Sequence, residues 1–193
     1  MPITDIDVAN VSLDLLKENV ISSFDDDKVV GRWMKRNYPI VRDIVLALNP
    51  WSFAVTRDTL SETLPVPTFD YLHKYTKPAD CIRILPPRYN GQKNGPLVDY
   101  TIEGAYILTN AGAPLRIRYI KRIEDATLFS PLFIDAFTMN MALRLAPLLT
   151  GKSGLVTELK QSYKDTLTQA MFVDSADGTA AYTVGYDYDD ARE

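Results

Sequence analysis

The stretch NPWSFAVTRDTL, Asn49–Leu60, decides the fold because the spacing of apolar residues changes within it. Before it, apolar residues recur with the 3.6-residue spacing of a helix, whereas from Trp51 onward they alternate with a period of two. Pro50 prevents the helix from continuing. The pattern therefore predicts a half-buried strand beginning at Trp51, with Trp51, Phe53 and Val55 on one face.

The segments flanking this change carry helical patterns. Four helices are predicted, over residues 8–21, 27–48, 131–150 and 153–172. The acidic run Asp25–Asp27 suits the positive end of the second helix, and Pro39 should kink that helix. Trp33 lies on its apolar stripe, while Arg42 and Asp43 fall on its wetter side. Ser130 and Gly151 are placed to begin and to end the third helix.

The region between the second and third helices, about residues 51–123, is expected to be rich in β-structure. Candidate strands are FDYLHKY (69–75), CIRIL (81–85), VDYTIEG (98–104), AYILTN (105–110) and LRIRYIKRI (115–123). Glu103-Gly104 and the run NAGAP (110–114) are plausible hairpin connections. In the last strand, alternation places Leu115, Ile117 and Tyr119 on one face and Arg116, Arg118 and Ile120 on the other. One small antiparallel sheet follows from this pattern.

The predicted fold class is α+β: a bundle of about four helices, a small antiparallel sheet and an extended C-terminal tail. Residues 1–173 are expected to form a single domain and residues 174–193 a flexible arm with few aliphatic side chains and an acidic end. The candidate core residues are Trp33, Trp51, Phe53 and Tyr163. The candidate interface residues are Arg57, Tyr182, Tyr186, Tyr188, Asp189 and Asp190.

Composition narrows the functional class. The chain has 193 residues, 46% of them hydrophobic and 24% charged, which is typical of a globular protein. The net charge of −4 argues against a surface built to grip nucleic acid, because binding to phosphates depends on an excess of Lys and Arg. The single cysteine, Cys81, excludes an internal disulfide. Apolar runs are short, so no membrane-spanning segment is expected.

The sequence offers no recognisable catalytic, cofactor or metal site. His73 is the only histidine, and no nucleophile or carboxylate has a recognisable spacing from it, so a surface or interface role is the favoured interpretation. The acids Asp25–Asp27 lack the spaced oxygen ligands of a calcium loop. TGKSG (150–154) resembles part of a phosphate-binding loop, but Ala146 occupies the position of that motif's first glycine. We therefore expect a protein that is not an enzyme.

Several motifs together resemble the head-to-tail adaptor family of short-tailed bacteriophages, also called tail tubular protein A. In residues 24–60 the shared features are Tyr38, Arg42-Asp43, Pro50-Trp51, Phe53-Ala54, Arg57 and Leu60. KPADCIRIL (77–85) is similar to a further family segment, with Lys77 where leucine is commoner. Residues 100–170 resemble the family's hairpin, its Arg-x-Arg-Tyr strand and its last two helices. The resemblance covers roughly residues 22–171.

The resemblance implies a structural virion protein. Such adaptors form a ring, of twelve subunits in the family, beneath the portal protein, and they pass double-stranded DNA to a tail nozzle of the tail tubular protein B type. Tail fibres are a further candidate partner. The implied location is the head-tail interface of the virion, after synthesis in the host bacterial cytoplasm. A net negative charge suits a channel that must not retain DNA, and a polar, tyrosine-containing arm suits a segment that docks on a neighbouring subunit or the portal.

A second interpretation stays open. The strand at residues 115–122, with its basic sequence RIRYIKR, could act with neighbouring tyrosines as a nucleic-acid-binding module.

Overall fold

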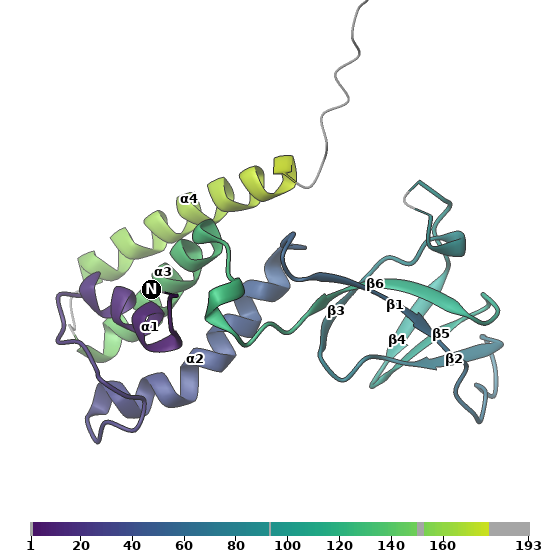
Figure 1. Cartoon of the computed structure of the whole chain (residues 1–193), viewed down its shortest axis with the longest axis horizontal. Helices are drawn as coiled ribbons and strands as arrows, with labels where there is room; N and C mark the ends of the chain where they lie inside the picture. Colours follow the sequence, from purple (N-terminus) through teal and green to yellow (C-terminus); the bar gives the residue numbers. More distant parts are fainter. Residues whose placement is uncertain (1, 93, 150–152, 178–193) are drawn as a thin grey trace, which may run out of the picture.

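In the part of the chain that the structure describes, four helices and six strands form an α+β structure with the helices at one end and the strands at the other (Figure 1). The computed structural model describes residues 2–92, 94–149 and 153–177. The helices are α1 (Asp5–Asp14), α2 (Val29–Leu48), α3 (Pro131–Leu149) and α4 (Ser153–Asp177). The strands are β1 (Val55–Leu60), β2 (His73–Thr76), β3 (Cys81–Leu85), β4 (Tyr100–Glu103), β5 (Tyr106–Thr109) and β6 (Leu115–Lys121). Two 3₁₀ turns, η1 (Tyr89–Gly91) and η2 (Ala126–Leu128), complete the order.

The first helix is shorter than the expected range of 8–21 and begins earlier. A capping box fixes its start, because the Thr4 side chain accepts from the Asp7 backbone N–H and the Asp7 carboxylate accepts from that of Thr4. Beyond Asp14 the chain turns, with Lys17 at a φ of 58°. Ile21 does reach the helical core, but from a loop that Asn10 holds through two hydrogen bonds to the Ile21 backbone. The apolar spacing therefore predicted the burial of Ile21 correctly, but it placed this residue in a helix where the chain forms a loop.

The second helix starts at Val29, and the preceding acids do not cap it. Its N-cap is Lys28, which makes no side-chain capping bond, whereas Asp25 and Asp27 form ion pairs with Lys35 and Arg32 at 2.6 and 2.7 Å. The helix continues through Pro39 to Leu48. The acidic run expected at the positive end of α2 therefore does not cap it: Asp25 and Asp27 pair with basic side chains of the helix, and Asp26 accepts from the Ser22 N–H.

The segment after α2 is a turn, not the strand expected from Trp51. The Trp51 carbonyl accepts hydrogen bonds from the backbone N–H groups of Ala54 and Val55, and β1 begins only at Val55. Trp51 is fully buried and donates its indole N–H to the Val45 carbonyl at 2.9 Å. The alternation thus marked buried aromatic side chains correctly but assigned them to the wrong backbone conformation.

An aromatic cluster fills the helical core near this turn. Trp51 meets Phe133 edge-on at a centroid distance of 5.3 Å, and half-buried Phe53 meets the same ring at 5.1 Å. Trp33 and Tyr163 are also half-buried. Trp33 packs against the helical core from α2, and burial raises the pKa of the Tyr163 hydroxyl on α4. All four candidate core residues therefore belong to the helical part.

The third helix begins as expected, with the Ser130 hydroxyl accepting from the Phe133 N–H. Among the described helices, α3 alone is long and apolar enough, by length and composition, to cross a bilayer, and half of its most apolar stretch is buried inside the molecule. The expectation that the chain has no membrane-spanning segment stays a prediction. The predicted end of α3 at Thr150 and Gly151 lies outside the described residues. The fourth helix extends to Asp177, so residues 174–177 are helical and do not belong to an arm.

The strands of the described residues form two three-stranded antiparallel sheets, where one sheet was predicted. Their orders are β1-β6-β3 and β2-β5-β4. Gly104 and Ala105 connect β4 to β5 in a hairpin, one residue later than the predicted Glu103-Gly104 connection, with Gly104 at a φ of 56°. The NAGAP run is not a hairpin connection, because β5 and β6 belong to different sheets. A second hydrophobic core lies in the β part, formed by Leu60, Tyr75, Ile84, Ile107, Leu115, Ile117 and Tyr119.

The central strand β6 contributes to both cores. Leu115, Ile117 and Tyr119, on one face, are buried in the β core, as the alternation predicted. Ile120, on the other face, is fully buried in the helical core. Arg116 and Arg118 share the face of Ile120 but are exposed and half-buried, respectively. One strand therefore joins the two parts and leaves two arginines at the surface of the β part.

Candidate functional site

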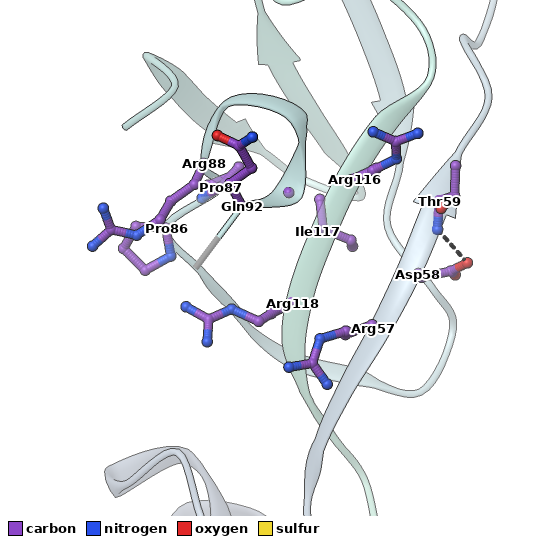
Figure 2. A pocket seen from close by; sticks show the side chains of 11 residues that line it. Arg57, Asp58, Thr59, Pro86, Pro87, Arg88, Gln92, Arg116, Ile117 and Arg118 are labelled. Atoms are coloured by element: carbon purple, nitrogen blue, oxygen red, sulfur yellow. Dashed lines mark hydrogen bonds between the residues drawn. The ribbon is translucent and has the colours of Figure 1, made fainter. Parts of the chain in front are cut away.

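Two facing strands bring arginines together on one side of the first sheet. In the β1-β6 ladder Arg57 is paired directly with Arg118, and Thr59 with Arg116. Arg57 and Thr59 lie on the face of β1 opposite to Leu60, which points into the β core. The alternation of β6 places Arg116 and Arg118 on the corresponding outer face. The register thus sets Arg57 beside Arg118 (Figure 2).

The segment 86–92 closes this surface into a pocket of about 180 Å³. We call it the arginine pocket; its lining residues include Arg57, Arg88, Arg116 and Arg118 (Figure 2). Arg88 donates to the Gly95 carbonyl at 2.7 Å, and Arg116 donates to the Asn90 carbonyl at 3.2 Å.

Gly91 permits this close approach of segment 86–92 to β6. Its φ is +69°, and a Cβ added there would meet the Arg116 Cβ at 3.0 Å. Both the backbone conformation and the available space therefore favour glycine at this position.

The positive charge of the arginine pocket is poorly balanced by the residues around it. Among the described residues, neither Arg57 nor Arg118 has a hydrogen-bond or ion-pair partner. Of the described residues that line the pocket, Asp58 alone is acidic. Strand alternation places it on the opposite face from Arg57, and its carboxylate accepts from the Thr59 N–H. Four arginines against this one carboxylate give the lining a net charge of +3.

Guanidinium groups in such an arrangement can bind oxyanions. Each presents a planar set of N–H donors that matches a carboxylate or a phosphate, and each stays protonated at any physiological pH. The pocket is therefore suited to binding and not to acid-base catalysis. Sequence reasoning singled out Arg57 as an interface residue and the strand 115–122 as a basic surface. It did not place Arg57 beside Arg118, and it missed Arg88.

A second exposed feature is the connection between β1 and β2, residues 61–72, which we call the apolar loop. It carries four exposed large apolar side chains: Leu64, Val66, Phe69 and Leu72, with Phe69 76% and Leu72 68% exposed. Figure 1 shows this connection at the end of the β part away from the helices. Apolar side chains gathered in this way on a loop are typical of a surface that meets another protein.

A buried carboxylate clamps the junction between the helical and β parts. Asp174 of α4 is 9% exposed and accepts from the Asn49 amide at 3.1 Å, from the Ser52 N–H at 3.0 Å and from the Ser52 hydroxyl at 2.9 Å. These three bonds hold the turn after α2 against the end of α4. The prediction of an arm from residue 174 missed this contact, because its partners are more than 120 residues away in the sequence.

Ion pairs brace the other side of the junction. The Arg42 side chain is buried, in contrast to the prediction of a wetter position, and its guanidinium lies 3.0 Å from the Asp43 carboxylate. That carboxylate also accepts from Arg122, just after β6, at 2.7 Å. Asp43 therefore links α2 to the strand that both cores share. The periodicity of α2 could not reveal this contact, because Arg122 is 79 residues away from Asp43 in the sequence.

The remaining sequence candidates have structural partners or fall outside the described residues. His73 on β2 forms a 2.8 Å hydrogen bond with Glu62, and Cys81 is partly buried, which raises the pKa of its thiol. The described residues contain no group of three or more metal-ligating side chains. The candidate interface residues of the tail lie outside the described residues: Tyr182, Tyr186, Tyr188, Asp189 and Asp190.

Comparison with known proteins adds no functional assignment: no protein-family model matches the chain, and no curated protein matches its sequence.

Proposed function

We propose that the protein is a structural subunit of a ring-forming head-to-tail adaptor, which docks under a phage portal and joins it to the tail nozzle. In this proposal the ring has twelve subunits and forms part of the channel through which DNA leaves the head. The motif resemblance around Arg42-Asp43 and Pro50-Trp51 suggests the class. The apolar loop is the observation that carries an assembly role.

A ring requires two different surfaces on each subunit, because a head-to-tail contact joins unlike patches. The apolar loop supplies one candidate at the far end of the β part. The other end of the molecule offers Val29, Trp33 and Leu148, which line a shallow hollow between α2 and α3 together with three basic side chains. Exposed apolar surface at two separated places fits a subunit with neighbours on both sides.

The motifs shared with the adaptor family also fall at the junction between the two parts. Trp51 is in the helical core, and Asp43 contacts both Arg42 and Arg122. Rigid support at this place would set the angle between the helices and the sheets. Because one contact surface of this proposal lies on each part, that angle sets the rotation between neighbouring subunits and hence the number of subunits in a closed ring. A braced junction therefore supports the proposal.

Electron microscopy of the purified protein, alone and mixed with the portal of the same phage, tests this function. We expect twelve-fold rings in at least the mixture. The double variant Phe69→Ser/Leu72→Ser should abolish them, whereas Val20→Ser, which replaces an apolar side chain 59% exposed in another loop, should leave them intact. A chain that stays monomeric and never joins the portal, with phage lacking it still retaining DNA and attaching tails, contradicts the proposal.

The arginine pocket favours one alternative, a nucleic-acid-binding module built on strand 115–122. Filter binding across salt concentrations separates the two functions, because phosphate contacts weaken steeply as salt rises. High affinity for DNA at low salt with such a dependence supports the module. Failure to bind DNA at low salt removes it.

A further inference from the structure

We propose that, in the isolated chain, the acidic C-terminal segment Asp187–Glu193 binds in the arginine pocket of the same molecule. The segment has the sequence DYDDARE. It contains four carboxylates and one arginine, so its net charge is −3. The lining of the pocket carries +3. This inference does not depend on the adaptor function.

The pocket itself requires a counter-charge. Arg57 and Arg118 are directly opposed in adjacent strands, and like charges in such pairs destabilise a sheet. Among the described residues neither guanidinium has an anionic partner. An arriving carboxylate could accept two parallel N–H bonds from either arginine, which is the strongest geometry available to this pair of groups.

The shape of the pocket favours a peptide carboxylate over a DNA duplex. The lining is concave, and segment 86–92 covers one side of it (Figure 2). A volume of about 180 Å³ accommodates one or two oxyanion groups on a narrow chain. A duplex backbone presents phosphates along a broad convex surface and needs a matching stripe of positive charge. Segment 86–92, which covers one side of the lining, would keep so broad a surface away from the arginines.

The clamp at Asp174 brings the end of the chain within reach. Because Asp174 is bonded to Ser52, only the five residues from Ser52 to Arg57 separate the clamp from the pocket, at most about 18 Å. The last turn of α4 from Asp174 to Asp177 adds about 4.5 Å. The ten residues from Asp177 to Asp187 can span about 33 Å, which is more than the distance required. Figure 1 shows α4 ending on the side of the helices nearer to the sheets.

Pulsed electron–electron double resonance, which measures the distance between two spin labels, tests the inference on the full-length chain. Cys81→Ser removes the native thiol, and Thr59→Cys with Ala191→Cys place spin labels at the pocket and in the acidic segment. At low salt we expect a narrow short-distance component, which should be lost in 1 M salt, where charge interactions are screened beyond about 3 Å. Diluting labelled chains with unlabelled chains should leave that component unchanged, because both labels are in one molecule.

Two variants and one control identify the groups involved. Neutralising the segment (Asp187→Asn, Asp189→Asn, Asp190→Asn and Glu193→Gln) should abolish the short component, and so should Arg57→Gln/Arg118→Gln. The matched control Arg36→Gln/Arg83→Gln also removes two exposed arginines but none from the pocket, so it should retain the component.

Three results would overturn the inference. The first is the absence of a short component at low salt. The second is its loss on dilution, which would assign the pocket to the segment of a neighbouring chain. The third is a DNA duplex that binds wild type, but not Arg57→Gln/Arg118→Gln, while the labels stay far apart, because the pocket would then be a nucleic-acid site.

Discussion

Replacing Asp174 with alanine should destabilise the protein more than its place near the end of a helix suggests. The substitution removes three hydrogen bonds to one buried carboxylate, from the Asn49 amide and from the N–H and hydroxyl of Ser52. It also leaves the side-chain amide of Asn49 without its carboxylate acceptor, in a residue that is only 5% exposed. Both consequences weaken the junction between the helical and β parts.

The magnitude follows from the bonds that are lost. A hydrogen bond to a charged group contributes about 1.5–3 kcal/mol, and bonds that share one acceptor are not additive. We therefore expect Asp174→Ala to lower the free energy of unfolding by about 2–4 kcal/mol. For a chain of this length, such a loss lowers the melting temperature by about 4–16 °C.

Urea unfolding followed by circular dichroism measures this loss. Asp174→Asn keeps one oxygen acceptor and the size of the side chain, so it should lower the free energy of unfolding by less than Asp174→Ala does. Asp165→Ala is the matched control, since it removes an exposed carboxylate from the same helix and should change stability by less than about 0.5 kcal/mol. A double-mutant cycle with Asn49→Ala should show a coupling energy above about 0.5 kcal/mol. If Asp174→Ala is as stable as Asp165→Ala, the clamp does not hold the junction.

Three further perturbations test other parts of the fold. Trp51→Ala should cost about 3–5 kcal/mol in chemical denaturation, as a large-to-small change in a full core, and wild-type stability combined with failure to join the portal would make Trp51 an interface residue. Asp43→Ala removes the nearest anion of buried Arg42 and should cost about 3 kcal/mol, whereas Glu124→Ala, at an exposed carboxylate 3.6 Å from Arg42, should cost less than about 1 kcal/mol. Burial, with a hydrogen bond to Asp80, raises the pKa of Tyr119 to about 12. Since unfolded tyrosine titrates near pH 10, stability should fall as pH rises from about 10 to 12, and Tyr119→Phe should flatten that fall in pH-dependent unfolding.

The sequence predicted those features that depend on neighbouring residues. The α+β class, the long helices and the burial of Leu115, Ile117 and Tyr119 follow from periodicity, which local spacing records directly. Trp51 was assigned to the core through an alternation that the backbone does not follow. Its burial was still predicted, because its alternation partners Phe53 and Val55 are apolar, and Trp51 is fully buried in the structure.

Features that depend on contacts between distant segments were not predictable in this way. Asp174 was predicted to begin a polar arm, because no neighbouring residue in the sequence indicates that its carboxylate accepts a hydrogen bond from the Ser52 N–H. The arginine pocket requires the pairing of β1 with β6, and a shift of one residue would move Arg118 away from Arg57. The Arg-x-Arg spacing at residues 116–118 was the available signal, because it places both side chains on one face of a strand.

The double role of β6 has a consequence for folding fidelity. Tyr119 belongs to the β core and its neighbour Ile120 to the helical core. A strand with one buried face is penalised once when it slips by one residue, whereas a slip of β6 would expel both side chains from their cores and turn Arg118 inward. Mispaired intermediates should therefore be strongly disfavoured. The register of this single strand therefore couples the packing of the helical part to that of the β part. Neither part can reach its native packing while β6 is misaligned with the other.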